Sequence, residues 1–231
     1  MIKVAGFQTN SFIDYPGKIA SVVFLGGCNF RCFYCHNAKL FDFDSNYIPF
    51  DETLSKIKEQ IGFIDGVVIT GGEPTLHPQL EKMISEIHKL GLKVKLDSNG
   101  ANPRLLKKIV NSGMIDYVAM DVKAPLAKYG EIAGVDKFND GVLESIKFLI
   151  GQEKVDYMFR TTLAPKLTEK DMREMAKMIA GAKCFQLQQF VPNEFSNSHP
   201  VINLPYSKDV AEKFASLFKK NISNVLMRGF D

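Results

Sequence analysis

Short apolar runs rich in β-branched residues alternate along this chain with amphipathic stretches, six times in succession. The runs cover residues 19–25, 66–70, 92–97, 116–123, 155–163 and 184–191, and the stretches cover 51–61, 77–90, 102–113, 138–150, 168–180 and 206–220. This alternation predicts an α/β fold with parallel strands joined by crossover helices. Two closures are open to six such units: a doubly wound open sheet, or a barrel-like wrap that stays incomplete and open on one side.

The stretch 77–90 shows the helical pattern most clearly. Pro78 lies near its start and Gly91 just past its end, where each residue type is tolerated or favoured. Asn102 and Thr168 are expected to cap two further helices. The apolar residues of 77–90 recur at three- and four-residue spacing, which places them on one helical face; they are Leu80, Met83, Ile84, Ile87 and Leu90.

The composition is 45% hydrophobic and 24% charged over 231 residues, which suits a single globular domain covering residues 1–231. The net charge of +3 is small, and no block of Lys or Arg predicts nucleic-acid binding. No apolar run reaches the roughly 18 residues of a transmembrane helix, and the first residues lack the pattern of a signal peptide. We therefore expect no membrane partner and a cytoplasmic location, where clustered cysteines serve metal or redox chemistry.

Three of the four cysteines lie on one short loop, in the stretch 26–40. Cys28, Cys32 and Cys35 are separated by three residues and then by two. Three thiolates would leave one iron of a four-iron cluster free for an outside ligand. Two other interpretations stay open: a zinc site completed by His36, and haem c attachment, which requires an exported protein and leaves Cys28 unexplained. The spacing favours the iron–sulfur cluster.

Polar motifs follow four successive predicted strands at the point where each strand ends. The cysteine loop is the first, and Gly71–Pro74, Asp97–Gly100 and Asp121–Lys123 come after it. In parallel α/β folds the carboxyl ends of the strands carry the functional site. We therefore expect the four motifs to meet at one mouth.

The spacing of the three cysteines, with aromatic Tyr34 before the last, resembles the signature of the radical S-adenosylmethionine (SAM) superfamily. The subsequent order GGEP, DSNG, DVK is similar to that superfamily's layout over most of the chain. The opening residues and the motifs CHN, LDSNG and MDVK resemble the glycyl-radical enzyme activases. Among these, the chain is most similar to anaerobic ribonucleoside-triphosphate reductase activating proteins and also resembles pyruvate formate-lyase activating enzyme. The resemblance implies a partial (β/α)6 TIM-like barrel of the radical SAM type.

The same resemblance implies two cofactors, a [4Fe–4S] cluster on the three cysteines and SAM. Reductive cleavage of SAM would give a 5′-deoxyadenosyl radical that installs a glycyl radical on a partner enzyme. Glu73 would face the methionine ammonium of SAM, and Lys123 its carboxylate. The residues implied at the SAM site are Tyr34, Gly71, Gly72, Glu73, Asp97, Ser98, Asn99, Asp121, Lys123 and Arg160.

Two further assignments depend on the resemblance. Asp97, Ser98 and Asp121 match positions that help to hold a monovalent cation beside SAM in pyruvate formate-lyase activating enzyme. Asp14, in the stretch IDYPGK, resembles an aspartate that approaches the target glycine loop, so we add it to the catalytic residues Cys28, Cys32 and Cys35. The alternative for Asp14 is a Tyr-Pro-Gly turn that it caps, and the alternative for Asp121 and Lys123 is an ion pair across a strand end.

Other expectations concern the end of the chain. Activases place adenine contacts near residues 191–194, where this chain lacks the histidine of pyruvate formate-lyase activating enzyme. Cys184 is expected to be a small core residue rather than a ligand. Gln186 and Gln188 share one strand face, and one face of that strand should point into the barrel.

The resemblance implies that the partner is a glycyl-radical enzyme, and the similarity to activating proteins of anaerobic ribonucleotide reductase favours that reductase. It also implies an electron donor such as flavodoxin or ferredoxin. The alternatives are an activase of another glycyl-radical enzyme, a radical SAM enzyme acting on a small molecule in the manner of 7-carboxy-7-deazaguanine synthase, and a zinc-bound structural module.

Overall fold

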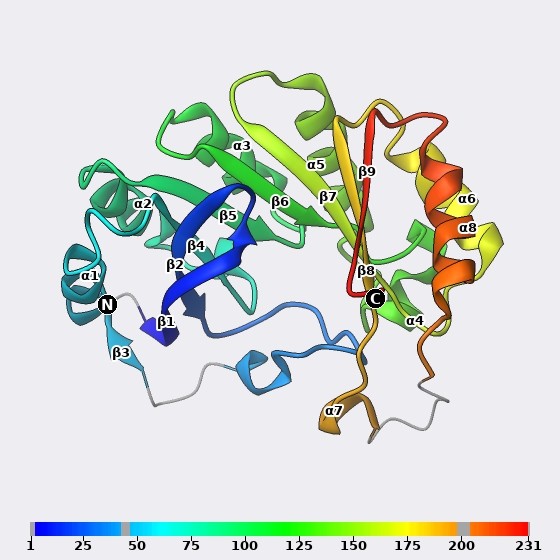
Figure 1. The fold of residues 1–231 in the computed structure, drawn as a ribbon, viewed down its shortest axis with the longest axis horizontal. Coiled ribbons are helices and arrows are strands. Elements are labelled where there is room, and N and C mark those ends of the chain that lie inside the picture. Colours follow the sequence, from blue (N-terminus) through cyan, green and yellow to red (C-terminus); the bar gives the residue numbers. More distant parts are fainter. Residues whose placement is uncertain (1–2, 43–46, 198–203, 231) are drawn as a thin grey trace.

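The computed structural model describes residues 3–42, 47–197 and 204–230. Within them the strands form one sheet in the order β3-β1-β2-β4-β5-β6-β7-β8-β9, which is open at β3 and β9 (Figure 1). Seven strands run parallel, namely β2 and β4 to β9, and β1 runs antiparallel to both β2 and β3. The strands are β1 (Lys3–Tyr15), β2 (Lys18–Leu25), β3 (Ile48–Pro49), β4 (Gly66–Gly71), β5 (Lys93–Ser98), β6 (Tyr117–Asp121), β7 (Asp156–Leu163), β8 (Cys184–Gln189) and β9 (Asn224–Arg228).

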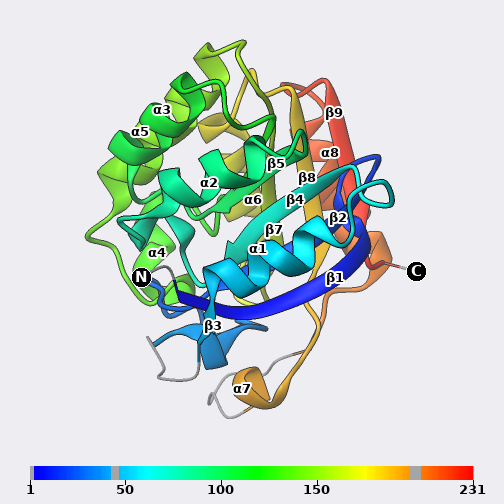
Figure 2. The same cartoon turned by 90° about the vertical axis from the view of Figure 1, so that its left-hand side faces the viewer.

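The longer helices lie along the outside of the curved sheet, as the two ribbon views together show (Figures 1 and 2). Among the described residues, no helix has the length and apolar character needed to cross a membrane. The helices are α1 (Phe50–Lys58), α2 (Leu80–His88), α3 (Pro103–Asn111), α4 (Tyr129–Ile132), α5 (Asn139–Gly151), α6 (Glu169–Met178), α7 (Glu194–Asn197) and α8 (Lys208–Phe218), with 3-10 turns η1 (Ala38–Leu40), η2 (Pro74–Leu76) and η3 (Leu126–Lys128).

The predicted incomplete α/β barrel is confirmed, because all six expected strand–helix units are present and the sheet does not close. The number of strands was underestimated, since β9 adds a seventh parallel strand and β1 adds an antiparallel neighbour to β2. The register of β1 against β2 shifts at three places along the strand. Such bulges break the two-residue alternation by which a strand is recognised, and β9 has only five residues at the sheet edge.

The caps predicted from sequence are also confirmed. The Asn102 side chain accepts a hydrogen bond from the Leu105 amide, and Thr168 forms a reciprocal capping box with Asp171 at the start of α6. In α2 the residues Leu80, Met83, Ile84 and Ile87 are all buried.

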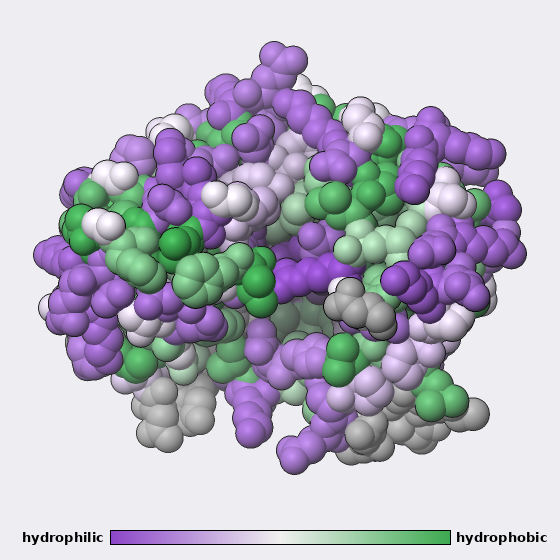
Figure 3. Space-filling model, viewed as in Figure 1, coloured by the Kyte–Doolittle hydropathy of each residue, from purple (hydrophilic) through white to green (hydrophobic). Residues whose placement is uncertain are grey.

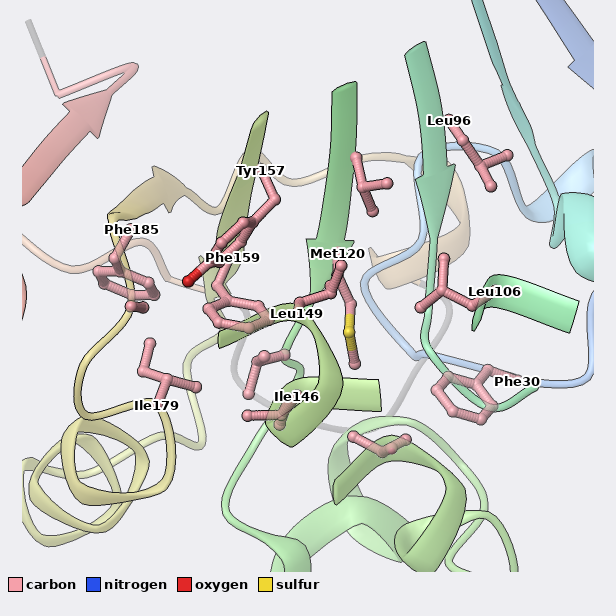
Figure 4. Close-up of a cluster of buried hydrophobic side chains, with 14 of the residues drawn as sticks. Phe30, Leu96, Leu106, Met120, Ile146, Leu149, Tyr157, Phe159, Ile179 and Phe185 are labelled. Atoms are coloured by element: carbon pink, nitrogen blue, oxygen red, sulfur yellow. The ribbon is translucent and has the colours of Figure 1, made fainter. Parts of the chain in front are cut away.

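The two faces of the sheet differ in chemistry because side chains alternate along each strand. On the outer face, Met120 of β6 and Phe159 of β7 pack with Ile146 and Leu149 of α5 in a continuous hydrophobic core (Figure 4). All four are fully buried, and each such side chain contributes about 1.5–3 kcal/mol by burial. The inner, concave face is left free to carry polar groups.

Strand β5 shows this division within four residues. Val94 and Leu96 belong to the outer core, whereas Lys95 and Asp97 face the concave side. The α/β fold therefore places charged residues in the hollow that the strands surround.

Candidate active site

One cavity of about 280 Å³ lies on the concave side, at the carboxyl ends of the parallel strands. Figure 3 shows this hollow near the centre of the molecular face, with hydrophilic atoms at its floor. All residues predicted for the site line it, so the expected convergence of strand ends is confirmed as geometry. They are Asp14, Cys28, Cys32, Tyr34, Cys35, Gly71, Gly72, Glu73, Asp97, Ser98, Asn99, Asp121, Lys123 and Arg160.

The cysteine loop leaves β2 and is held by backbone hydrogen bonds to the segment that closes it. Gly27 N donates to Leu40 O at 2.8 Å, and Cys28 N donates to Phe41 O at 2.9 Å. All four cysteines are free thiols. Only the three on the loop line the cavity, whereas Cys184 lies at the opposite end of β8, partly exposed, and accepts a hydrogen bond from Asn224.

The thiols of the loop are held in their neutral form by burial. Burial raises the pKa of Cys28 and of Cys32 to about 11 each, and it also raises the pKa of Cys35. The neighbouring Lys123 opposes this shift at Cys32 and Cys35. A metal centre binds thiolates, so loading these cysteines with metal would displace their protons.

The two glycines of the GGEP motif allow the end of β4 to lie against the start of the cysteine loop. Gly71 has a φ of +117°, which side-chain-bearing residues rarely adopt. A Cβ on Gly72 would lie 2.1 Å from the carbonyl oxygen of Gly27. These positions require glycine because two backbone segments touch there.

Glu73 is buried and its carboxylate is already well supplied with hydrogen-bond donors. Its Oε1 accepts from Thr75 N at 3.0 Å and from Ser98 Oγ at 2.9 Å, and its Oε2 accepts from Asn99 N at 2.7 Å. Burial raises the pKa of Glu73, while these hydrogen bonds oppose the rise. Glu73 also caps η2 through the hydrogen bond that it accepts from Thr75 N. The Glu73 carboxylate therefore links the GGEP motif to the DSNG motif at the cavity wall.

Five charged side chains of alternating sign form a network at the cavity floor, four of them in the lining and Lys95 beneath it. Arg160 Nη1 donates to Asp97 Oδ2 at 3.0 Å and Arg160 Nε donates to Asp121 Oδ1 at 2.8 Å. Lys123 Nζ donates to Asp121 Oδ2 at 2.8 Å, and Lys95 Nζ donates to Asp97 Oδ1. The ion pair that was the alternative for Asp121 and Lys123 is therefore present, but inside the cavity as part of a larger network.

The network fixes the charge of its members. Burial raises the pKa of Asp121, but the Arg160 and Lys123 cations outweigh burial and hold that pKa well below its usual range. Burial lowers the pKa of Lys123, and the Asp121 carboxylate outweighs it and raises the pKa. In the cavity lining, the Arg160 and Lys123 cations pair with Asp97 and Asp121, so two cationic side chains are within reach of an anionic ligand.

Asp14 reaches the cavity from β1, just before the hairpin turn. The turn itself is present, since Tyr15 pairs with Lys18 and Gly17 has a φ of +68°. The Asp14 carboxylate accepts a hydrogen bond from Ser11 Oγ at 2.6 Å and lines the cavity. Asp14 therefore lies beside the turn, as its alternative interpretation requires, and also lines the cavity.

Three polar residues of the lining were not predicted from the sequence, namely Asn37, Thr70 and Thr162, whereas Gln188 does line the cavity from a strand that was expected to turn one face into the barrel. Thr162 lies two residues after Arg160 on β7, so the alternation of strand faces could have identified it. Residues 191–194, expected to contact adenine, do not line the main cavity. Asn193 instead donates from Nδ2 to Cys35 O at 3.1 Å and lines a second pocket that shares His36 with the main cavity.

Comparison with known proteins decides the family. The sequence profile described as the radical SAM superfamily matches residues 22–179, which include the cysteine loop and the later strand-end motifs. The chain belongs to the radical SAM superfamily. It is therefore a radical SAM enzyme, and membership implies SAM and a [4Fe–4S] cluster as its cofactors.

Relatives of this radical SAM enzyme carry related names. Over 97% of its length it is 33% identical to a Methanocaldococcus jannaschii protein named as a glycyl-radical enzyme activating enzyme, of which it covers 95%. SuiB of Streptococcus suis, solved with SAM bound, superposes with a TM-score of 0.66 at 15% identity, over 87% of this chain and 48% of SuiB. A domain of pyruvate-formate lyase-activating enzyme from Bacteroides vulgatus superposes with a TM-score of 0.55 at 16% identity, over 71% of this chain and 99% of that domain. These two likenesses establish the fold.

The cavity fits the two cofactors that the superfamily implies. Three free thiols lie beside a polar floor, and the buried Tyr34 hydroxyl lies against the Cys32 thiol at the wall. Three cysteines on one loop suit a four-iron cluster with one iron left free for a ligand such as SAM.

Proposed function

We propose that this radical SAM enzyme is a glycyl-radical enzyme activase of one domain, working in the cytoplasm, whose partner is an anaerobic ribonucleotide reductase. The observation that carries the proposal is the cavity in which the three loop thiols and the SAM-side residues meet next to Asp14. The relative that is similar over nearly the whole chain and is named for glycyl-radical enzyme activation supports the choice of partner class.

Each part of the cavity has a task in this proposal. Cys28, Cys32 and Cys35 would hold the cluster, which would supply the electron for SAM cleavage after reduction by a donor such as flavodoxin or ferredoxin. Lys123 and Arg160 would hold the SAM carboxylate, since both are cationic and line the cavity. The buried wall around Tyr34 excludes water from the reactive radical.

Asp14 provides the approach to the partner. It lies on the side of the cavity where the sheet is open, and the two residues before it, Phe12 and Ile13, are 69% and 67% exposed. A protein substrate must bring a backbone glycine to a buried cofactor, which requires an open side and a surface on which to dock. A monovalent cation at Asp97, Ser98 and Asp121 stays a prediction from the family resemblance and is considered further below.

The test is anaerobic reconstitution with iron and sulfide, reduction, and addition of SAM with and without the anaerobic ribonucleotide reductase of the same organism. We expect 5′-deoxyadenosine and, with the reductase, a glycyl radical signal in electron paramagnetic resonance. Cys32→Ala should fold but bind no cluster and form neither product. Formation of 5′-deoxyadenosine without any glycyl radical would redirect the proposal to another partner or to a small molecule, and a protein that keeps zinc and refuses iron would contradict it.

A further inference from the structure

Lys95 is a buried lysine to which the site as described so far gives no task. It lies on β5 two residues before Asp97, and 1% of its surface is exposed. Lysine is almost never fully buried unless its ammonium has a partner. Here Asp97 Oδ1 accepts a hydrogen bond from Lys95 Nζ. Lys93, two residues earlier on the same strand, instead reaches the surface and pairs with Asp116 at 2.7 Å.

Lys95 supports Asp97 from beneath the cavity. Asp97 lines the cavity, whereas Lys95, two residues earlier on the same face of β5, is further from the carboxyl end of the strand and does not belong to the described lining. Burial lowers the pKa of Lys95, and the Asp97 carboxylate opposes this, with a smaller contribution from Asp14. The ammonium therefore lies against Asp97 and outside the described cavity lining.

The residues expected to hold a monovalent cation already have other donors. Asp97 Oδ2 accepts from Arg160 and from Thr70 Oγ1 at 3.3 Å. Both oxygens of Asp121 accept from cationic side chains, and the Ser98 hydroxyl donates to Glu73. A mobile cation would have to approach Lys95, Arg160 and Lys123, whose positive charges repel it. This constellation does not fit a free Na⁺ or K⁺.

The Lys95 ammonium can balance the charge of Asp97 during SAM binding, which is the task that a mobile cation would otherwise perform. When Arg160 and Lys123 turn toward the SAM carboxylate, Asp97 loses a cationic partner at the moment of binding. A carboxylate left buried without a counter-charge is strongly disfavoured. Lys95 lies too deep to follow the ligand and so stays with Asp97.

We propose that Lys95 is a built-in counter-ion of the SAM site, which keeps Asp97 charged and oriented and replaces the monovalent cation that the family resemblance predicts. Lys95 is thus a positioning residue that acts through Asp97. SAM binding by this chain then requires neither Na⁺ nor K⁺. The proposal depends on SAM binding, which superfamily membership implies, and is independent of the protein that receives the radical.

The test is the dissociation constant of SAM, measured by anaerobic titration calorimetry on the reconstituted protein in choline chloride, NaCl and KCl at equal ionic strength. Wild-type affinity should agree within about twofold in the three salts. Lys95→Met should bind SAM at least about tenfold more weakly in choline chloride, a loss of about 1.4 kcal/mol. KCl or NH₄Cl should restore part of this loss. A merely structural role would not make the affinity depend on the identity of the cation.

Two further variants keep the test decisive if Lys95→Met does not fold. Lys95→Arg keeps the positive charge and should bind SAM in choline chloride as the wild type does. Lys93→Met removes a lysine from the same strand outside the cavity and should leave SAM affinity unchanged in all salts. Wild-type affinity that rises about tenfold from choline chloride to KCl would overturn the proposal, as would a Lys95→Met variant that binds SAM normally without Na⁺ or K⁺.

Discussion

At the scale of single residues, the site depends on charges that are buried together. Arg160 is the centre of the network, because its guanidinium reaches Asp97 and Asp121 with separate nitrogens. Lysine could not make both contacts, since its ammonium is a single point of charge. Removing any member leaves another charge in the cavity without its partner, so the members depend on one another.

Asp121→Asn tests the network directly. The change leaves Arg160 and Lys123 without a carboxylate between them, so we expect a loss of up to about 3–5 kcal/mol in the free energy of unfolding, as for a broken buried ion pair. SAM affinity should fall more than iron content, because Asp121 lies on the floor and the cluster thiols lie on the loop. Denaturation, SAM titration and iron analysis measure the three quantities.

The control for this prediction is Asp116→Asn. Asp116 pairs with the exposed Lys93 away from the cavity and also accepts a hydrogen bond from Val94 N at 2.9 Å, which the asparagine oxygen can keep. Only the surface ion pair is then lost, and such pairs contribute about 0–1 kcal/mol. SAM affinity that is the same in Asp121→Asn as in the wild type would remove Asp121 from the site.

At the scale of elements, the cavity exists because strand ends come very close. The end of β4 touches the start of the cysteine loop, where Gly72 and Gly27 have no room for a side chain between them. The GGEP motif therefore has a packing function as well as a place in the SAM site. A change that separates the two segments should disturb the cysteines without altering any of them.

Gly72→Ala should separate these segments. Its Cβ would lie 2.1 Å from Gly27 O, so the backbone must shift, at a cost of about 1–3 kcal/mol. Because Gly27 precedes Cys28, we also expect less iron per chain after reconstitution. Gly151→Ala is the matched control, since nothing lies within 4 Å of a Cβ at Gly151, and there iron loading should be unchanged. Full iron loading of Gly72→Ala would show that the loop does not need this contact.

The capping box of α6 gives a prediction for acid pH. Burial raises the pKa of Asp171, but hydrogen bonds from Lys128 and Thr168 outweigh it and lower the pKa overall. A carboxyl group whose pKa is lower when folded stabilises the protein above its unfolded pKa of about 3.9, and this contribution is lost as the pH falls through the folded pKa. Asp171→Asn should therefore cost about 1 kcal/mol near neutral pH.

Unfolding of both proteins at several pH values checks this sign. The difference between wild type and Asp171→Asn should shrink toward zero once the pH falls below the lowered folded pKa of Asp171, where the carboxyl is protonated in both states. A difference that grows as the pH falls would contradict the assignment of Asp171 as the ionised cap.

At the scale of the whole molecule, the two ends of the curved sheet approach each other beside the site without pairing. Arg228 of β9 donates from Nη1 to Ile13 O of β1 at 3.3 Å. Near this contact the strongly exposed Phe12 and Ile13, which we name the β1 rim, stand next to Asp14. Figure 3 shows hydrophobic atoms at the left-hand side of the hollow. Exposed apolar groups beside a cavity are typical of a surface that binds another protein.

Replacing both residues of the β1 rim by Ser tests its role in docking. Because they are exposed, we expect a change within about 0.5 kcal/mol in stability and unchanged SAM cleavage by the enzyme alone. The yield of glycyl radical on the partner should fall severalfold, measured by electron paramagnetic resonance. Ile61→Ser with Phe63→Ser is the matched control, since both residues are about half exposed and neither lines the cavity. Equal radical yields in the two double variants would exclude the β1 rim as a docking surface.

The sequence by itself determined the elements and motifs that depend on neighbours along the chain. Helix α2 followed from the spacing of its apolar residues, the caps at Asn102 and Thr168 from local hydrogen bonding, and the meeting of the motifs from the rule that parallel strands end at one face. The spacing of the cysteines was enough to indicate the superfamily, because its ligands lie on one loop.

Only the tertiary structure decided what depends on residues far apart in the chain. Asp97 of β5 pairs with Arg160 of β7 only because the concave faces of these two strands meet across β6. The alternation of side chains alone does not say which face of a strand is concave. Strand β1 required the partner β2 to stabilise an irregular, bulged sequence. Glu73 acquired donors from two other strand-end motifs only when the strands assembled. The charges that the cavity presents to a ligand are therefore a property of the assembled sheet.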